Sequence, residues 1–118
     1  MTFAELGTAL NNITVGTGAS AHKLKFAHYA WASAPSGDYG VYGQDGADQF
    51  QANNRFGEVA GTGWVDWYTL TDDETAKNAI ESCFKTLQDT NTFAWYLNSV
   101  QYEYKTNFLH YEWIVELA

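Results

Sequence analysis

The chain lacks several features that would place it in a specialised class of protein. Its 118 residues include one cysteine, Cys83, and one proline, Pro35. A single cysteine cannot form an intramolecular disulfide, which excludes a disulfide-stabilised scaffold and fits a reducing compartment. No run of about 18 apolar residues is present, so we expect no membrane-spanning helix. The N-terminal stretch has Glu5 where a secretory signal has basic residues, and we expect no export signal.

Basic residues are also scarce. Six Lys and Arg stand against 14 Asp and Glu, which gives a formal net charge of −8. A surface of this sign repels phosphate backbones, so sequence-specific binding of DNA or RNA is not expected. The hydrophobic content of 46% is enough for a modest core. We therefore expect residues 1–118 to form a single soluble domain.

Two amphipathic helices are predicted. Thr2 and Glu5 form a capping-box pattern, and apolar residues follow at spacings of three and four up to Ile13, so a helix opens the chain and ends before the glycines at 16 and 18. A second helix is predicted over about residues 72–88, where Thr71 and Glu74 repeat the capping pattern and two aspartates occupy the first turn. Its core-facing stripe is Ala76, Ile80, Cys83, Phe84 and Leu87.

Three strands are predicted between the helices. Residues 24–31 could form a helix or a strand, and their aromatic side chains and the turn signal that follows favour a strand. Residues 39–44 form a second short strand. Residues 64–70 carry apolar side chains on both faces, which is typical of a central strand. A long, polar, glycine-rich connection separates the last two strands, and connections of that length usually carry function.

The last 26 residues contain eight of the 20 aromatic residues of the chain. We interpret them as a hairpin of strands 94–104 and 109–117, in a register that pairs Tyr102 with Tyr111 and Val100 with Trp113. The side expected to face the core holds Tyr96, Val100, Tyr102, Tyr104, Leu109, Tyr111, Trp113, Val115 and Leu117. The other side keeps Phe93, Trp95, Leu97, Phe108 and Ile114, which suit a helix or a neighbouring subunit. The predicted fold is α+β: two helices packed on a mostly antiparallel sheet that ends in a C-terminal β-hairpin.

No constellation typical of an enzyme or a metal site is found. His22, His28 and His110 do not have the spacing of metal ligands. Cys83 lies on the apolar stripe of the second helix, where a buried thiol is a better interpretation than a nucleophile. We therefore expect no enzyme activity, no catalytic residue, no metal and no cofactor.

Three stretches of the chain resemble the small tail-completion or tail-terminator proteins of long-tailed, non-contractile bacteriophages and prophages. They are FAHYAWASAPSGDYGVYGQDGADQFQANNR, WVDWYTLTDDETAKNAIES and AWYLNSVQYEYKTNFLHYEWIVEL. The residues that match the family pattern are Pro35, Tyr39, Asp48, Phe50, Ala52, Asn53, Tyr68, Thr69, Tyr111, Glu112 and Glu116. The chain departs from the pattern in having only Pro35 where the family has a proline-rich lead into the strand at Tyr39.

The resemblance implies a structural protein of the virion tail or neck, assembled in the host cytoplasm. It would form a homohexameric ring that caps the tail tube, ends its polymerisation and joins it to a head-completion or connector protein. A head-to-tail ring uses two different patches of each subunit. DNA would only pass through the acidic lumen, and no membrane is involved.

Candidate contact residues come from the polar loop at residues 44–57 and from the outer side of the hairpin. The loop is our candidate for a contact arm, and the alternative is a flexible surface loop. Those for the subunit or tail-tube interface are Tyr42, Asp45, Asp48, Phe50, Asn53, Arg55, Phe93, Trp95, Leu97 and Ile114. Two alternatives stay open. One is a head-completion or stopper ring of the phage neck. The other is a carbohydrate-binding module, which would need aromatic side chains exposed in a coplanar row.

Overall fold

The computed structural model describes residues 1–45 and 61–118, and the structural statements below concern these two ranges. Its main layer is a five-stranded sheet with the strand order β3-β4-β5-β7-β6. The strands are β3 (Phe26–His28), β4 (Tyr39–Gln44), β5 (Gly61–Thr69), β6 (Phe93–Glu103) and β7 (Phe108–Leu117). All neighbouring strands are antiparallel except β3 and β4, which run parallel.

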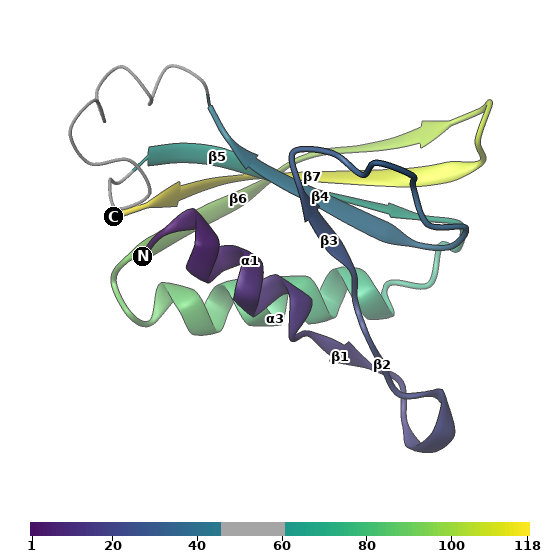
Figure 1. The fold of residues 1–118 in the computed structure, drawn as a ribbon, viewed down its shortest axis with the longest axis horizontal. Helices are drawn as coiled ribbons and strands as arrows, with labels where there is room; N and C mark the ends of the chain where they lie inside the picture. Colours follow the sequence, from purple (N-terminus) through teal and green to yellow (C-terminus); the bar gives the residue numbers. More distant parts are fainter. Residues whose placement is uncertain (46–60) are drawn as a thin grey trace.

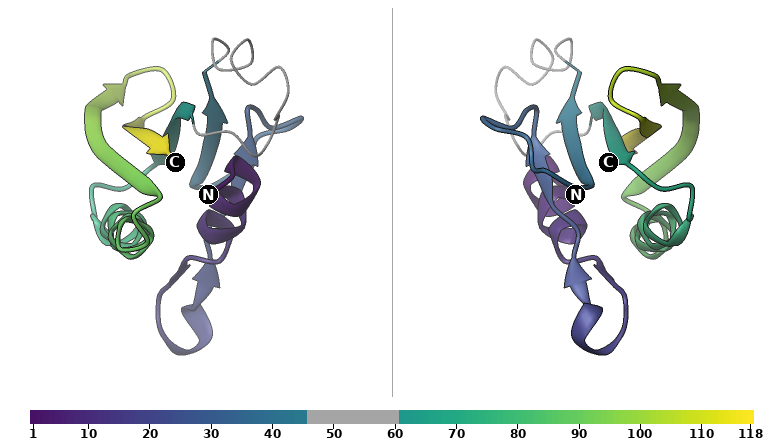
Figure 2. Two further views of the ribbon diagram at one scale, coloured as in Figure 1. Left: turned by 90° about the vertical axis from the view of Figure 1, so that its left-hand side faces the viewer. Right: turned by 90° about the vertical axis from the view of Figure 1, so that its right-hand side faces the viewer.

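Two helices form the second layer, on one face of the sheet. Figures 1 and 2 show α1 (Phe3–Asn11) below β3 and β4, and α3 (Thr75–Gln88) below β6 and β7. A short ribbon of β1 (Thr14–Val15) and β2 (His22–Lys23) extends away from the sheet, with a 3₁₀ turn at Gly18–Ser20 between its strands. The predicted α+β class, with helices on a mostly antiparallel sheet and a terminal hairpin, is confirmed. The described residues include no helix long and apolar enough to cross a membrane.

Helix α1 forms for the predicted reason. The Thr2 hydroxyl accepts a hydrogen bond of 3.1 Å from the Glu5 amide, which satisfies one of the free N–H groups at the helix start. The apolar stripe of Phe3, Leu6 and Leu10 is buried against the sheet. Within the β1–β2 ribbon, Gly16 directly follows β1, and its φ of +85° lies in the left-handed region that favours glycine.

Helix α3 begins three residues later than predicted. The Thr71 hydroxyl accepts from the Asp73 amide at 3.1 Å, and the Asp73 carboxylate accepts from the Thr75 amide at 2.7 Å. These two side chains therefore stabilise successive turns before the helix and do not form a capping box with Glu74. The predicted stripe is confirmed, because Ile80 and Phe84 are fully buried and its other members pack against the core.

The predicted central strand is confirmed as β5, the third strand of five. Val65, Trp67 and Thr69 are buried on the helix side, and Asp66 and Tyr68 are half-buried on the opposite face. Strand β4 has the predicted bounds, while β3 is limited to three residues of the predicted stretch. Its parallel pairing to β4 was not predicted, since residue patterns do not specify strand direction.

The predicted hairpin exists, but the predicted register of its two strands was wrong. Val100 lies opposite Tyr111, Tyr102 lies opposite Leu109, and an irregularity between Leu97 and Ser99 leaves Asn98 without an opposing residue in the register of β7. The turn spans residues 104–107, and its last residue, Asn107, has a φ of +61°. A bulge of one extra residue exchanges the two faces of a strand.

The bulge places the aromatic side chains of β6 differently from the prediction. The core side of β7 is as predicted, with Tyr111, Trp113, Val115 and Leu117 buried. On β6 the assignment was wrong: Phe93 is 5% exposed and its ring lies 5.3 Å from that of Phe84, while Tyr96 is 57% exposed. The remaining predicted core residues of this half of the hairpin, Val100, Tyr102 and Tyr104, are exposed as well.

Candidate functional site

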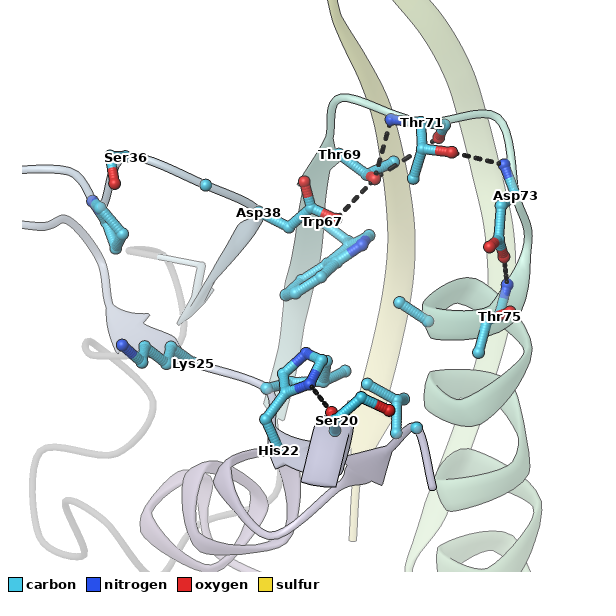
Figure 3. A pocket seen from close by; sticks show the side chains of 16 residues that line it. Ser20, His22, Lys25, Ser36, Asp38, Trp67, Thr69, Thr71, Asp73 and Thr75 are labelled. Atoms are coloured by element: carbon cyan, nitrogen blue, oxygen red, sulfur yellow. Dashed lines mark hydrogen bonds between the residues drawn. The ribbon is translucent and has the colours of Figure 1, made fainter. Parts of the chain in front are cut away.

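An open groove of about 620 Å³ lies between the β1–β2 ribbon, the connection before β4 and the connection from β5 to α3. Figure 3 shows Trp67 of β5 in its wall, above His22. Apolar side chains of Val15, Leu24 and Ala76 complete the lining near the helix. The groove therefore joins three segments that are distant in the sequence around one tryptophan.

The polar groups of the groove make hydrogen bonds that fix the conformation of the connection from β5 to α3. Asp38 accepts two hydrogen bonds, from the Thr69 hydroxyl at 2.7 Å and from the Leu70 amide at 3.0 Å. The Thr69 oxygen also accepts from the Thr71 amide at 3.3 Å. The Asp73 carboxylate accepts a hydrogen bond from the Thr75 amide, and hydrogen bonding to Thr75, first through its side chain and then through its amide, lowers the pKa of Asp73. These contacts account for the carboxylates and hydroxyls without a nucleophile–base pair.

The face of the sheet away from the helices carries a cluster of ionisable side chains. His110 of β7 lies with Nε2 3.3 Å from Asp66 Oδ1 of β5 and with Nδ1 3.6 Å from Glu103 Oε2 of β6. Glu112 lies beside Asp66 in the register and accepts a 2.9 Å hydrogen bond from the Asn98 amide group. Three adjacent strands thus bring three carboxylates to one histidine.

Burial and charge act in opposite directions within this cluster. Burial alone would lower the pKa of His110, but Asp66, together with the charges of Glu103 and Glu112, raises it overall. Burial raises the pKa of Asp66, and His110 opposes that shift. The side chains of His110 and Asp66 are less than one-sixth exposed and are in contact. His110 therefore keeps its proton to a higher pH than an ordinary histidine does.

Aromatic rings continue the cluster across the sheet. Tyr68 stacks on His110 with centroids 4.2 Å apart and on Tyr39 of β4 at 4.9 Å. Phe108 meets both tyrosines edge to face. Burial, followed by the charge of Asp66, raises the pKa of Tyr68 to about 12, so this phenol stays protonated at neutral pH. The rings of Tyr39, Tyr68 and Phe108 thus form an uncharged aromatic surface beside the cluster of His110 and the carboxylates.

Exposed apolar side chains concentrate on β6 and its turn. Among the described residues, five of the seven large hydrophobic side chains that are exposed belong to this segment: Tyr96, Leu97, Val100, Tyr102 and Tyr104. The rings of Tyr102 and Tyr104 are perpendicular, with an interplanar angle of 90°. They therefore do not form a coplanar row.

The predicted contact residues do not form one patch. Tyr42 is 9% exposed and packs so closely on α1 that a Cβ on Gly7 would overlap its hydroxyl group. Asp45 is exposed beyond the end of β4. The predicted arm residues Asp48, Phe50, Asn53 and Arg55 lie outside the described residues, as does Ala52.

The hairpin candidates divide between the two sides of the sheet. The outer placement of Phe93 and Trp95 was wrong, since Phe93 is in the core and the Trp95 ring lies 5.4 Å from that of Phe84. Leu97 is 37% exposed on the helix side, opposite Trp113. Ile114 is half-buried on the opposite face. Sequence analysis missed the cluster around His110 because its members come from three strands whose register was needed to bring them together.

Cys83 and the histidines offer little support for metal or thiol chemistry. Burial raises the pKa of the Cys83 thiol, which disfavours the reactive thiolate. Within residues 1–45 and 61–118, no group of three or more His, Cys, Asp or Glu side chains is arranged to hold a metal ion.

Comparisons with protein-family models, with curated proteins and with solved structures find no match to this chain.

Proposed function

We propose that this protein is a structural subunit of a bacteriophage tail. It assembles into a homohexameric ring that caps the tail tube, ends tube polymerisation and joins the tube to the head connector. The tube protein and a head-completion or connector protein are its partners, and the virion tail or neck is its location after assembly in the host cytoplasm. The resemblance of three stretches to tail-terminator proteins is the starting point of this proposal.

One structural observation supports self-assembly. Both helices lie on the same face of the sheet, and no helix of the described residues lies on the other face. That face holds Trp64, Tyr68, Phe108 and Ile114, all half-buried and therefore still partly open to solvent. Large apolar surfaces that the fold leaves uncovered typically mark contacts with another protein.

The same face also carries acidic side chains. Asp66, Glu103 and Glu112 lie next to the aromatic stack. In a ring, the apolar part of this face would contact a neighbouring subunit, and acidic side chains beside it would keep a passing phosphate backbone from binding. The proposal thus assigns different roles to adjacent parts of one surface.

The mass of the purified protein tests the ring. Light scattering or native mass spectrometry is expected to give a particle near six times the chain mass of 13.2 kDa. Electron microscopy should show a six-fold particle with a central hole. A stable monomer at the concentrations of assembly would overturn the proposal.

A charge placed on the uncovered face tests whether this face is the contact between neighbouring subunits. Ile114→Lys is expected to dissociate the ring while circular dichroism stays unchanged, because the residue is half-buried at the surface and not in the core. Leu70→Lys is the matched control, since Leu70 is 54% exposed in the connection from β5 to α3 and belongs to none of the strands of this face. A ring that survives Ile114→Lys and is lost with Leu70→Lys would place the contact elsewhere.

A stopper ring of the phage neck is the nearest alternative. Pull-down with purified tube protein and with the portal adaptor distinguishes the two, since a terminator binds the tube and a stopper binds the adaptor. A carbohydrate-binding module gains no support from the perpendicular rings of Tyr102 and Tyr104. Specific binding in a glycan array would reverse that assessment.

A further inference from the structure

The two edges of the five-stranded sheet differ in whether another strand could join them. At the β3 edge, the side-chain amide of Asn11 donates to the Phe26 carbonyl at 3.1 Å and accepts from the Phe26 amide at 2.9 Å. At the opposite edge, no strand or side chain of the described residues bonds to the outward backbone groups of β6. An edge of 11 residues, about 37 Å long, is thus open to pairing.

The side chains along this open edge favour contact with an identical chain. Residues 93–102 include no charged side chain, although the chain as a whole has a net charge of −8. Two copies of so acidic a protein repel each other over most of their surfaces, and the repulsion is weakest where charge is absent. Natural edge strands are usually protected by charged residues, and β6 has none between Phe93 and Tyr102.

The exposed area is appropriate for such a contact. Tyr96, Tyr102 and Tyr104 are 57%, 51% and 86% exposed. At about 200 Å² for each tyrosine, they alone present roughly 400 Å² per copy, which is about half of what one partner buries in a standard interface. Leu97 and Val100 add to this area.

The alternation of β6 also specifies a self-complementary register. Leu97, Val100 and Tyr102 point to the helix side, as shown by their places opposite Trp113, Tyr111 and Leu109. With Asn98 bulged out, antiparallel pairing of two copies about Val100 sets Val100 beside Val100 and Leu97 beside Tyr102. The polar Ser99 then lies beside Gln101. On the helix side apolar residues therefore meet apolar residues, whereas on the other face Tyr96 lies beside Glu103; a shift of one residue would lose the apolar match.

We propose that two copies of this chain associate through the outer edges of their β6 strands, antiparallel and about a two-fold axis near Val100, so that their sheets become one. A strand added to an open edge is held by main-chain hydrogen bonds, and the alternating side chains supply specificity. A two-fold contact cannot close a six-membered ring, so this pairing is additional to the proposed ring and independent of it.

A single cysteine on the axis tests the geometry. Val100→Cys, in a Cys83→Ala background, is expected to form a disulfide-linked dimer under mild oxidation, because directly opposed residues have Cα atoms about 4.5–5.5 Å apart. Ser99→Cys alone is the control: it lies next to Val100 on the same open edge, yet its opposing residue in the proposed pairing is Gln101. Mixing the Ser99→Cys and Gln101→Cys proteins should restore the cross-link.

The outcomes separate this pairing from the ring. Cross-linking of Val100→Cys no faster than that of Ser99→Cys alone would overturn the pairing, whatever the oligomer mass. A six-fold particle without the Val100 cross-link leaves the proposed function standing and removes the pairing. Efficient cross-linking in a particle of two chains supports the pairing and counts against the ring.

Discussion

The two edge strands of the sheet differ in whether their outward backbone groups are hydrogen-bonded. Strand β3 is three residues long, and both outward backbone groups of Phe26 are bonded by one side chain of α1, Asn11. Strand β6 is 11 residues long, and its outward groups have no partner in the described residues. Edge strands invite unwanted pairing, and natural proteins block those that have no partner. The edge at β3 is thus blocked by a side chain of the same chain, whereas the edge at β6 is available for pairing with another chain.

The side chains follow the same division. Phe26 of β3 is 5% exposed and its ring lies 5.4 Å from that of Trp67, so this edge is fastened to the core. On β6 only the first residues, Phe93 and Trp95, pack under the sheet against α3. Beyond the bulge at Asn98, the strand extends past the helix layer with exposed apolar side chains. Stability should therefore depend on β3 much more than on the outer half of β6.

The largest expected effect comes from truncating one aromatic side chain at each edge. Phe26→Ala removes a buried ring and should lower the free energy of unfolding by about 3–5 kcal/mol. Tyr102→Ala removes a ring that is 51% exposed and should cost less than about 1 kcal/mol. Urea denaturation of dilute protein, followed by tryptophan fluorescence, measures both. Equal losses would contradict the contrast between the edges.

The hydrogen bonds from Asn11 that block the β3 edge should contribute less to the free energy of unfolding than the Phe26 ring does. Asn11→Ala leaves the Phe26 amide and carbonyl without their partner and should cost about 1–3 kcal/mol. Asn11→Asp keeps the acceptor and loses the donor, so its cost should be intermediate. Asn12→Ala is the control, because within the described residues the exposed Asn12 side chain bonds only Lys23, at 3.1 Å. Hydrogen exchange of the Phe26 amide should accelerate in the Asn11 variants and not in the control.

Charged side chains link β6 to β7 and β5, because His110 of β7 contacts both Glu103 of β6 and Asp66 of β5. The stability of this part of the sheet should therefore depend on pH. Asp66 and Glu103 raise the pKa of His110 overall, so protonated His110 stabilises the folded state. This contribution is fully present below the ordinary histidine pKa near 6.5 and is lost as the pH rises through the raised folded value. His110→Gln should flatten the decline of the free energy of unfolding across that interval. A decline of equal slope in the variant would show that other groups cause it.

The sequence predicted the parts of the fold that depend on local pattern. The apolar stripes of both helices, the bounds of β4 and the central position of β5 follow from periodicity and burial, and all are confirmed. The start of α3 was missed because Thr71 and Asp73 can bond to nearby amides in more than one way. The structure uses them in two turns before the helix.

The faces of β6 could not be predicted from alternation alone. A single extra residue, Asn98, reverses the assignment of everything before it, and no propensity marks Asn98 as a bulge. One signal was overlooked: Asn107 readily adopts a positive φ and so indicates the end of the turn. The cluster of His110 with Asp66 and Glu103 depends on that register, and sequence reasoning could not assemble it.

The smallest effect on stability should come from converting the open edge into a blocked one. Ser99→Lys adds a charge of the kind that protects natural edge strands, at a strand position without buried contacts in the core. The free energy of unfolding should change by no more than about 0.5 kcal/mol, because surface substitutions of this kind rarely do more. Two lysines brought to the shared edge should nevertheless weaken the pairing of two copies, which sedimentation velocity measures as a shift toward lighter species. Ser99→Thr, which keeps the strand neutral, should sediment as the unaltered protein does. If Ser99→Lys left the sedimentation unchanged, the open edge of β6 would not be where two copies meet, and its contrast with the edge closed by Asn11 would be a matter of folding alone.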